Sequence, residues 1–290
     1  MQPIKWSILN LHFWNIVVDC LMNVFIIPCP LFPTVSWYVL GVFNVFGIPA
    51  TVQCWILATA FSFVCLSTLL LFEDRYSNLV IYHKKVIENW EYVRHAWRFV
   101  HVVLCLVILL PIIRNVPDQE TAKQSVFNAL PCIPAFLETA VIIVPTLDNT
   151  VFIETVLTFA GAIFGQILIF TIFVIIALRY EPMARADSGL TQPLERRVFK
   201  SLIIQTMIPF VYLLLPISFA MLAVSTGFHN LAFNNLVVVL TSLHGLVSTL
   251  SMILIHKPYQ KFVLSMFKRK KAQESGARMF SKRTNSSAVP

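Results

Sequence analysis

Thr51 to Tyr76 reads TVQCWILATAFSFVCLSTLLLFEDRY, a run of 22 uncharged residues that ends abruptly at Glu73-Asp74-Arg75-Tyr76. About 20 consecutive, mostly apolar residues cross a bilayer core as an α-helix, so residues 51–72 predict a membrane span with its charged end at the boundary. The whole chain is 57% hydrophobic and only 12% charged. A water-soluble fold cannot bury so much apolar surface, so the composition predicts a polytopic membrane protein.

Six stretches of the chain satisfy the same test of length and composition. They are residues 8–28, 51–72, 97–113, 151–178, 201–224 and 235–256. Prolines and glycines interrupt the uncharged residues 29–50, which we interpret as a loop close to the lipid that could hide a re-entrant element. The predicted fold class is an all-α integral membrane protein, with a six-span bundle over residues 1–256.

The basic residues are distributed unequally between the two sides of these spans. Twenty of the 22 Lys and Arg residues lie before the first span, after the second and fourth, or in the tail, whereas Arg114 and Lys123 lie on the other side. Because Lys and Arg concentrate in cytoplasmic loops, both termini are expected inside and residues 114–150 outside. Anionic lipid accounts for the net charge of +8, so no nucleic-acid partner is expected.

Motifs for enzymatic chemistry were not found. The sequence contains no nucleophile elbow, no glycine-rich phosphate loop and no His-Glu-x-x-His helix, and its six cysteines form no Cys-x-x-Cys pair. We therefore predict no catalytic residues, no metal site and no cofactor. Transport has little support, because Asp19 is the sole charged residue near the middle of a span.

The stretch Glu73-Asp74-Arg75-Tyr76 is the strongest functional candidate. A carboxylate beside an arginine at the membrane boundary can hold the guanidinium until a partner offers other acceptors, which makes a two-state latch. The alternative is that Arg75 is an ordinary membrane anchor with acidic neighbours for solubility.

A second candidate lies at the end of the last span, in His256-Lys257-Pro258-Tyr259. Pro258 cannot continue the helical hydrogen bonds, so the chain should turn there along the membrane surface. Residues 257–271 then combine apolar residues at helical spacing with basic ones, which predicts an amphipathic juxtamembrane helix. Residues 272–290 are expected to be a disordered cytoplasmic tail.

Polar residues and prolines inside the spans are further candidates. Asp19 is either a hydration or ion site that biases helix packing, or a protonated group with only a packing role. His244 is expected to be a hydrogen-bonded packing group. Pro209 and Pro216 should kink the fifth span. Four further side chains are candidates for a ligand pocket or equally for helix-to-helix contacts: Gln53, Trp55, Gln166 and Gln205.

Cysteines on the outer side permit a disulfide bond. Cys132 lies in the long outer loop, and an oxidising exterior would allow it to pair with Cys54 at the top of the second span or with Cys29. We favour Cys54, which would fix the loop to a rigid helix.

Together, these residues resemble the nematode serpentine chemoreceptors of class h, which are G-protein-coupled receptors. The residues that carry the resemblance are Lys5-Trp6, Leu11 to Trp14, Asp19, Gly47 to Pro49, Gln53, Phe72 to Tyr76, Leu130 to Pro134, Gln205, Pro209, Pro216, His244 to Thr249 and His256 to Tyr259. The likeness extends to Phe267, and the order and spacing of the motifs make it specific.

The resemblance implies a chemosensory receptor in the plasma membrane of sensory neurons. It implies a small-molecule pocket in the outer half of a seven-helix bundle and a heterotrimeric G protein at the inner face, and a receptor oligomer is a further possible partner that the sequence does not decide. Arg75 would be the switch, with Glu73 or Asp74 as its restraint, although the family commonly has Asn at position 74. Members of the family have another span before Lys5-Trp6, so the chain is expected to lack the first of seven.

Two other classes of function fit the same sequence. A six-span transporter or channel subunit would naturally place both termini in the cytoplasm. A receptor remnant would insert but not signal, because a missing helix removes packing surface and part of any pocket.

Overall fold

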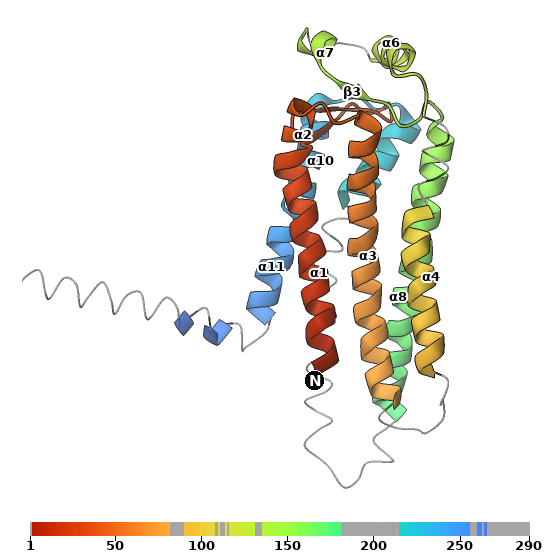
Figure 1. Cartoon of the computed structure of the whole chain (residues 1–290), viewed down its shortest axis with the longest axis vertical. Helices are drawn as coiled ribbons and strands as arrows, with labels where there is room; N and C mark the ends of the chain where they lie inside the picture. The colour runs from red at the N-terminus through yellow and green to blue at the C-terminus, as the bar shows by residue number, and fades with distance from the viewer. Residues whose placement is uncertain are drawn as a thin grey trace, which may run out of the picture.

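The computed structural model describes residues 2–81, 90–107, 110, 114, 116–130, 135–180, 203, 211, 215–255, 260–262 and 264–265. Within them, long helices run side by side and a smaller unit covers one end (Figure 1). We call the covered end the lid end, and the end at which the first helix begins the N-terminal end. The all-α membrane fold predicted from the sequence is confirmed.

The bundle is built from helices that alternate in direction, except that α10 continues into α11 (Figure 1). They are α1 (Gln2–Cys20) with a π-helical turn η1 (Leu21–Phe25), α3 (Ala50–Ile81), α4 (Trp90–Val107), α8 (Asn149–Tyr180), an apolar helix at Leu215–Thr226, α10 (Leu231–Ser242) and α11 (His244–Ile255). In the described part of the chain, four stretches are long and apolar enough to cross a membrane: Trp6–Phe25, Ala50–Ser77, Asn149–Ile176 and Leu231–Ser251. The six-span count stays a prediction, because 97–113 and 201–224 are only partly described.

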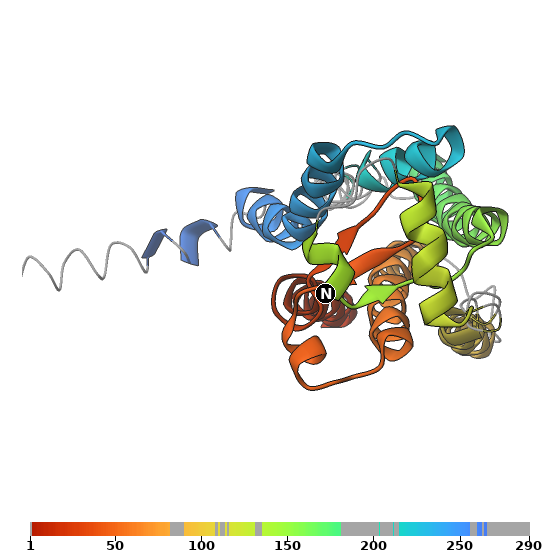
Figure 2. The same ribbon diagram turned by 90° about the horizontal axis from the view of Figure 1, so that it is seen from above.

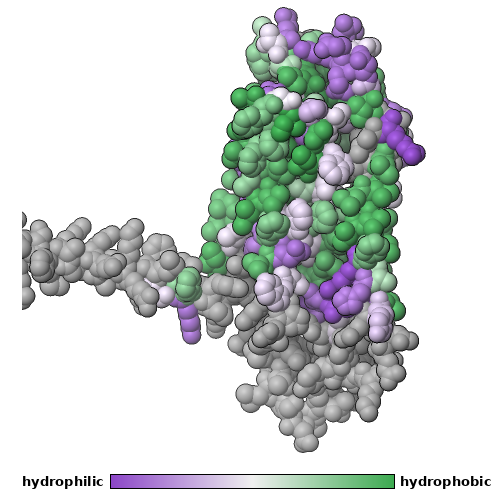
Figure 3. All heavy atoms as spheres, viewed as in Figure 1, coloured by the Kyte–Doolittle hydropathy of each residue, from purple (hydrophilic) through white to green (hydrophobic). Residues whose placement is uncertain are grey.

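Helix α3 lies at the centre of the bundle, where it packs against α1, α4 and α8. Its contact with α1 includes stacked rings of Trp14 and Phe63, whose centroids lie 4.4 Å apart. Toward α8, Leu69 and Phe72 are fully buried. The outward faces of the helices remain apolar, and Figure 3 shows this surface along the sides of the bundle, with hydrophilic residues gathered at the lid end. Such a surface suits acyl chains rather than water.

The lid combines a small sheet with three short helices. Strands β1 (Pro28–Pro30), β2 (Trp37–Val39) and β3 (Ile142–Ile143) pair antiparallel in that order. Helix α2 (Val42–Val45) follows β2, while α6 (Gln119–Ala129) and α7 (Phe136–Thr139) precede β3. Figure 2 shows the strands crossing over the end of the bundle, with α6 and α7 above them.

Side chains of the sheet alternate between the bundle and the lid. Trp37 and Ile143 pack into the cluster formed with α1 and α3, whereas Tyr38 and Ile142 pack with α6 and α7. The pairing of Trp37 with Ile143 and of Tyr38 with Ile142 puts like-facing residues opposite each other. The sheet therefore separates two apolar clusters.

Several predicted element boundaries were wrong. Residues 26–28 do not continue the first helix, because Ile27 has a φ of 48° and Pro28 begins β1. Residues 29–50 were predicted as a loop, yet they contain two strands and α2. The last span begins before residue 235, because Asn230 caps α10, and a turn at Leu243 divides it into α10 and α11.

Candidate functional site

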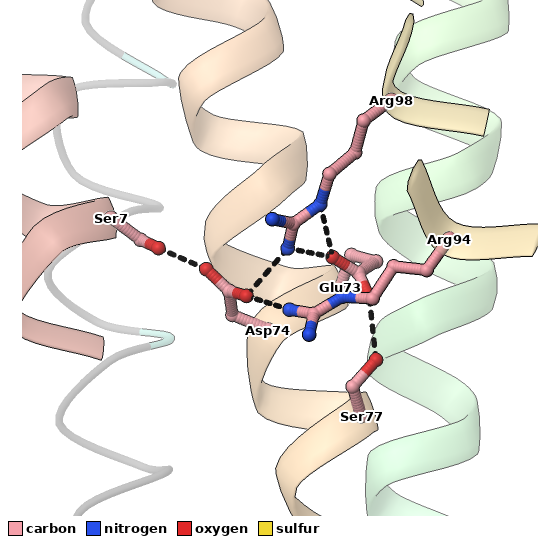
Figure 4. A network of polar contacts seen from close by, with 6 residues as sticks. All are labelled: Ser7, Glu73, Asp74, Ser77, Arg94 and Arg98. Carbon is pink, nitrogen blue, oxygen red and sulfur yellow. Dashed lines mark hydrogen bonds and ion pairs between the residues drawn. The ribbon is translucent and has the colours of Figure 1, made fainter. Parts of the chain in front are cut away.

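A network of charged side chains joins α1, α3 and α4 near the N-terminal end of the bundle (Figure 4). At its centre are Glu73 and Asp74 of α3, which are 2% and 3% exposed. Arg98 of α4 donates from Nη2 to Glu73 Oε2 at 2.5 Å and to Asp74 Oδ1 at 2.6 Å. Arg94 Nε lies 2.6 Å from Glu73 Oε1, and its Nη2 also donates to Asp74.

Two serines also donate hydrogen bonds to the carboxylates. Ser77 Oγ donates to Glu73 Oε1 at 2.5 Å, and Ser7 Oγ of α1 donates to Asp74 Oδ2. Three residues after Ser7 on α1, Asn10 Nδ2 donates to Ser67 Oγ of α3 at 2.7 Å. Three helices are thus tied together by polar contacts where a bilayer boundary is predicted.

Local helix geometry explains this arrangement. Arg94 and Arg98 are four residues apart on α4, so they project from one face. Burying a lone carboxylate is costly, and the two guanidiniums balance the charge of the two carboxylates and satisfy their oxygens. Guanidinium also binds a carboxylate through two nitrogens in a fixed geometry, which Lys cannot do.

The network changes the interpretation of the predicted latch. The sequence suggested that Glu73 or Asp74 restrains Arg75 locally, but the contacts described here join both acids to Arg94 and Arg98. The ring of Tyr76 lies 5.7 Å from that of Phe170 and 5.6 Å from that of Phe173, both on α8. Arg94 and Arg98 were counted only among the basic residues that orient the chain in the membrane. Their spacing of four residues already indicated that they share one helix face. The switching role of Arg75 stays a prediction.

Asp19 and His244 were singled out separately, and the structure brings them together between α1 and α11. His244 Nδ1 lies 3.7 Å from Asp19 Oδ1 and 2.9 Å from the carbonyl oxygen of Thr241. Beside them, Asn15 Nδ2 donates to Ser248 Oγ at 3.1 Å. A Cβ at Gly245 would overlap the Asp19 carboxylate. This cluster fixes the contact of α1 with α11.

A cavity of about 460 Å³ lies at the lid end, bounded by α3, the beginning of α8 and the sheet. Its walls include Trp37, Trp55, Val116, Ile143 and Phe152. Volumes of about 300–1,000 Å³ are usual for small-molecule sites.

The four side chains predicted as pocket candidates differ in where the structure places them. Trp55 lines the cavity. Gln53 is fully buried and donates to the carbonyl oxygen of Ile48 at 2.8 Å, and Gln166 donates to that of Ala162 at 3.2 Å. Gln205 lies outside the described residues.

Other predicted site residues are only partly described. His256, Lys257, Pro258, Tyr259, Pro209 and Cys132 lie outside the described residues, as does most of 257–271, of which 260–262 and 264–265 are helical. Pro216 is buried near the start of the helix at Leu215–Thr226. Cys29 and Cys54 are both free thiols, so the bridge to Cys132 stays a prediction. Among the described residues, no three His, Cys, Asp or Glu side chains converge as metal ligands.

Comparison with known proteins decides the family. Residues 1–269 match the profile of the family described as serpentine type 7TM GPCR chemoreceptor Srh. The chain belongs to this family. The chain is also similar to serpentine receptor class H-72 of Caenorhabditis elegans, with 28% identity over 277 residues that cover 93% of this chain and 78% of the relative. No solved structure matched the chain.

Membership of the Srh chemoreceptor family confirms the resemblance drawn from the motifs. It makes the chain a multi-pass membrane protein with a chemoreceptor role like that of G-protein-coupled receptors, and not an enzyme. Small-molecule ligands and G proteins are the general partners of such a family.

Proposed function

We propose that the chain binds a small molecule in the lid-end cavity and activates a heterotrimeric G protein at the opposite, cytoplasmic end, in the plasma membrane of sensory neurons. The observation that carries the proposal is the buried network of Glu73, Asp74, Arg94 and Arg98. It lies beside Arg75 and Tyr76, where the G protein would bind.

The network suits a switch because it is both strong and reversible. Its carboxylates are buried, whereas the arginine side chains are 18% and 28% exposed, so the basic partners can exchange these contacts for water or for another protein. A ligand shifts such an equilibrium only if it binds the two states with different affinity. Moving α4 away from α3 would break the ion pairs and expose the boundary around Arg75.

Helix α3 connects the cavity with the network. Cys54, Trp55 and Ala58 line the cavity, and Glu73 lies 15 residues beyond Ala58 on the same helix. At 1.5 Å per residue this is about 22 Å. A ligand that displaces or rotates α3 at the cavity would therefore also move Glu73 and Asp74, because one continuous helix joins the two sites.

A signalling assay in heterologous cells tests this proposal. The full chain is expressed with a promiscuous G protein and a panel of small volatile molecules, and surface expression is measured in parallel. We expect a ligand-evoked response that Arg75→Ala abolishes and that Arg114→Ala, a matched change at the opposite end, leaves intact. We also expect Glu73→Gln with Asp74→Asn to raise basal signalling. A response that survives Arg75→Ala in full at equal surface expression would contradict the coupling site.

A further inference from the structure

The walls of the lid-end cavity carry no charge. Ten residues line it, and its polar groups are the hydroxyl of Thr51, the thiol of Cys54 and the indole N–H groups of Trp37 and Trp55, all uncharged. An ionic ligand would lose its hydration there without gaining a partner, which is costly. The cavity therefore selects neutral molecules with a large apolar surface.

The sheet separates this cavity from the lid. Trp37 and Ile143 face it from the bundle side, whereas Val144 belongs to the lid cluster. Val144 lines a second cavity, of about 460 Å³, whose walls include Thr34, Ser125 and Asn149. The side chain of Gln119 pairs with the backbone of Val144, directly after β3. Its Nε2 donates to the Val144 carbonyl oxygen at 3.1 Å, and its Oε1 accepts from the Val144 amide at 3.0 Å.

The accessible side of the apolar cavity faces the bilayer. Val52 and Trp55 line it and remain 42% and 40% exposed, and both belong to the membrane-spanning stretch Ala50–Ser77. Exposed side chains on such a helix meet lipid, and Trp is favoured at the edge of the acyl-chain region. The second cavity lies on the lid side of the sheet, and among the described residues the two cavities share no lining residue.

From this geometry we infer that the cavity takes a neutral, lipophilic molecule that enters sideways from the bilayer between α3 and α8. The inference rests on the proposed function for its physiological meaning, because it names the class of the ligand and its route. Partitioning into the membrane would concentrate such a molecule beside the mouth at Val52 and Trp55. Water-soluble ions would be excluded by the sheet and by the uncharged walls.

Thiol accessibility in phosphatidylcholine nanodiscs tests the route. Ala58→Cys places a reporter on the cavity wall of the full chain, and native Cys54 is a second reporter. Hexyl methanethiosulfonate, which is neutral and enters bilayers, is compared with the charged sulfonatoethyl reagent, and peptide mass spectrometry locates the adducts. After normalisation to glutathione, we expect the hexyl reagent to react at position 58 at least about tenfold faster, because the sulfonate must be desolvated. Ser125→Cys, on the lid-side cavity, should react readily with both.

Blocking the cavity opening at Val52 and Trp55 is a second test of the route. Val52→Trp should slow the hexyl reaction at both reporters, whereas Leu168→Trp, at a lipid-facing residue away from the cavity, should not. Equal rates for the two reagents at position 58 would show an aqueous route, and a hexyl rate that Val52→Trp leaves unchanged would show that the molecule does not enter at this mouth. Both results overturn the inference. Because no step requires signalling, a silent G-protein assay with normal labelling would count against the proposed function alone.

Discussion

Arg98 binds Glu73 through two nitrogens, with Nη2 2.5 Å and Nε 3.1 Å from Oε2, where the Glu73 side chain is 2% exposed. Arg98→Ala removes one of the two guanidiniums that balance the acidic pair. Because Arg94 remains and Arg98 is partly exposed, we expect a loss of about 1–3 kcal/mol, below the full cost of an unpaired buried charge. Thermal unfolding in nanodiscs should show a lower Tm, and Arg98→Lys should recover only part of it, since Lys lacks the paired nitrogens.

A double-mutant cycle separates this ion pair from general packing. Combining Arg98→Ala with Glu73→Gln should cost less than the sum of the single changes, because the neutral amide no longer needs a cation. Additive losses would mean that Arg98 stabilises α4 by packing alone.

Gly245 accommodates the carboxylate of Asp19, so we predict that Gly245→Ala destabilises the contact of α1 with α11. The added methyl group overlaps the carboxylate, which can rotate away because it is the end of a side chain, so we expect a loss at the lower end of the about 1–3 kcal/mol that overpacking costs. Surface expression and Tm should fall, and Asp19→Ala in the same chain should restore both because it removes the clashing atoms. If the double variant has the same surface expression and Tm as Gly245→Ala, then contact with the Asp19 carboxylate is not the reason for glycine at position 245.

The spans were predictable because bilayer thickness sets a length that sequence alone reveals. Residues 51–72 and 151–178 fall within α3 and α8, and the charged stretch after Phe72 was found at the helix boundary. Local turns limited the rest. Thr241, Ser242, His244 and Gly245 surround Leu243, but such residues also occur inside continuous spans, so they did not predict that α10 ends there.

The partners of the site residues were harder to predict than the residues themselves. Asp19 and His244 were both selected as intramembrane polar groups, but their pairing depends on how α1 packs against α11. Glu73 and Asp74 were selected with Arg75 as their expected partner, and the ion pairs with Arg94 and Arg98 of α4 were not predicted. Such pairings require tertiary geometry, because helix periodicity indicates a face but not the helix that covers it. The sheet escaped detection because its strands are only two or three residues long.

The predicted disulfide bond of Cys132 is expected to involve Cys29 rather than Cys54. Cys29 packs against the lid cluster that contains Leu130, and the chain can carry Cys132 at most about 7 Å from Leu130, which keeps Cys132 on the same side of the sheet as Cys29. Cys54 packs with the bundle cluster across the sheet. Peptide mapping without reductant should recover Cys29 linked to Cys132, and Cys54→Ser should leave that link unchanged. Recovery of a peptide that links Cys54 to Cys132 would instead support the pairing favoured from the sequence.

The stability of the lid should depend on pH through Asp118. Its carboxylate accepts hydrogen bonds from the backbone amide and the hydroxyl of Thr121, which caps α6 and lowers the pKa of Asp118 below its usual 3.8. A carboxyl with a lowered pKa in the folded state stabilises fully above the unfolded value, and the contribution disappears as the pH falls through the folded value. Hydrogen exchange of the α6 amides, corrected for intrinsic rates, should therefore accelerate as the solution becomes more acidic than 3.8. Asp118→Asn keeps a side-chain cap without the titration, so its α6 should show no such acceleration. Equal acceleration in both chains would assign the effect to another acidic group.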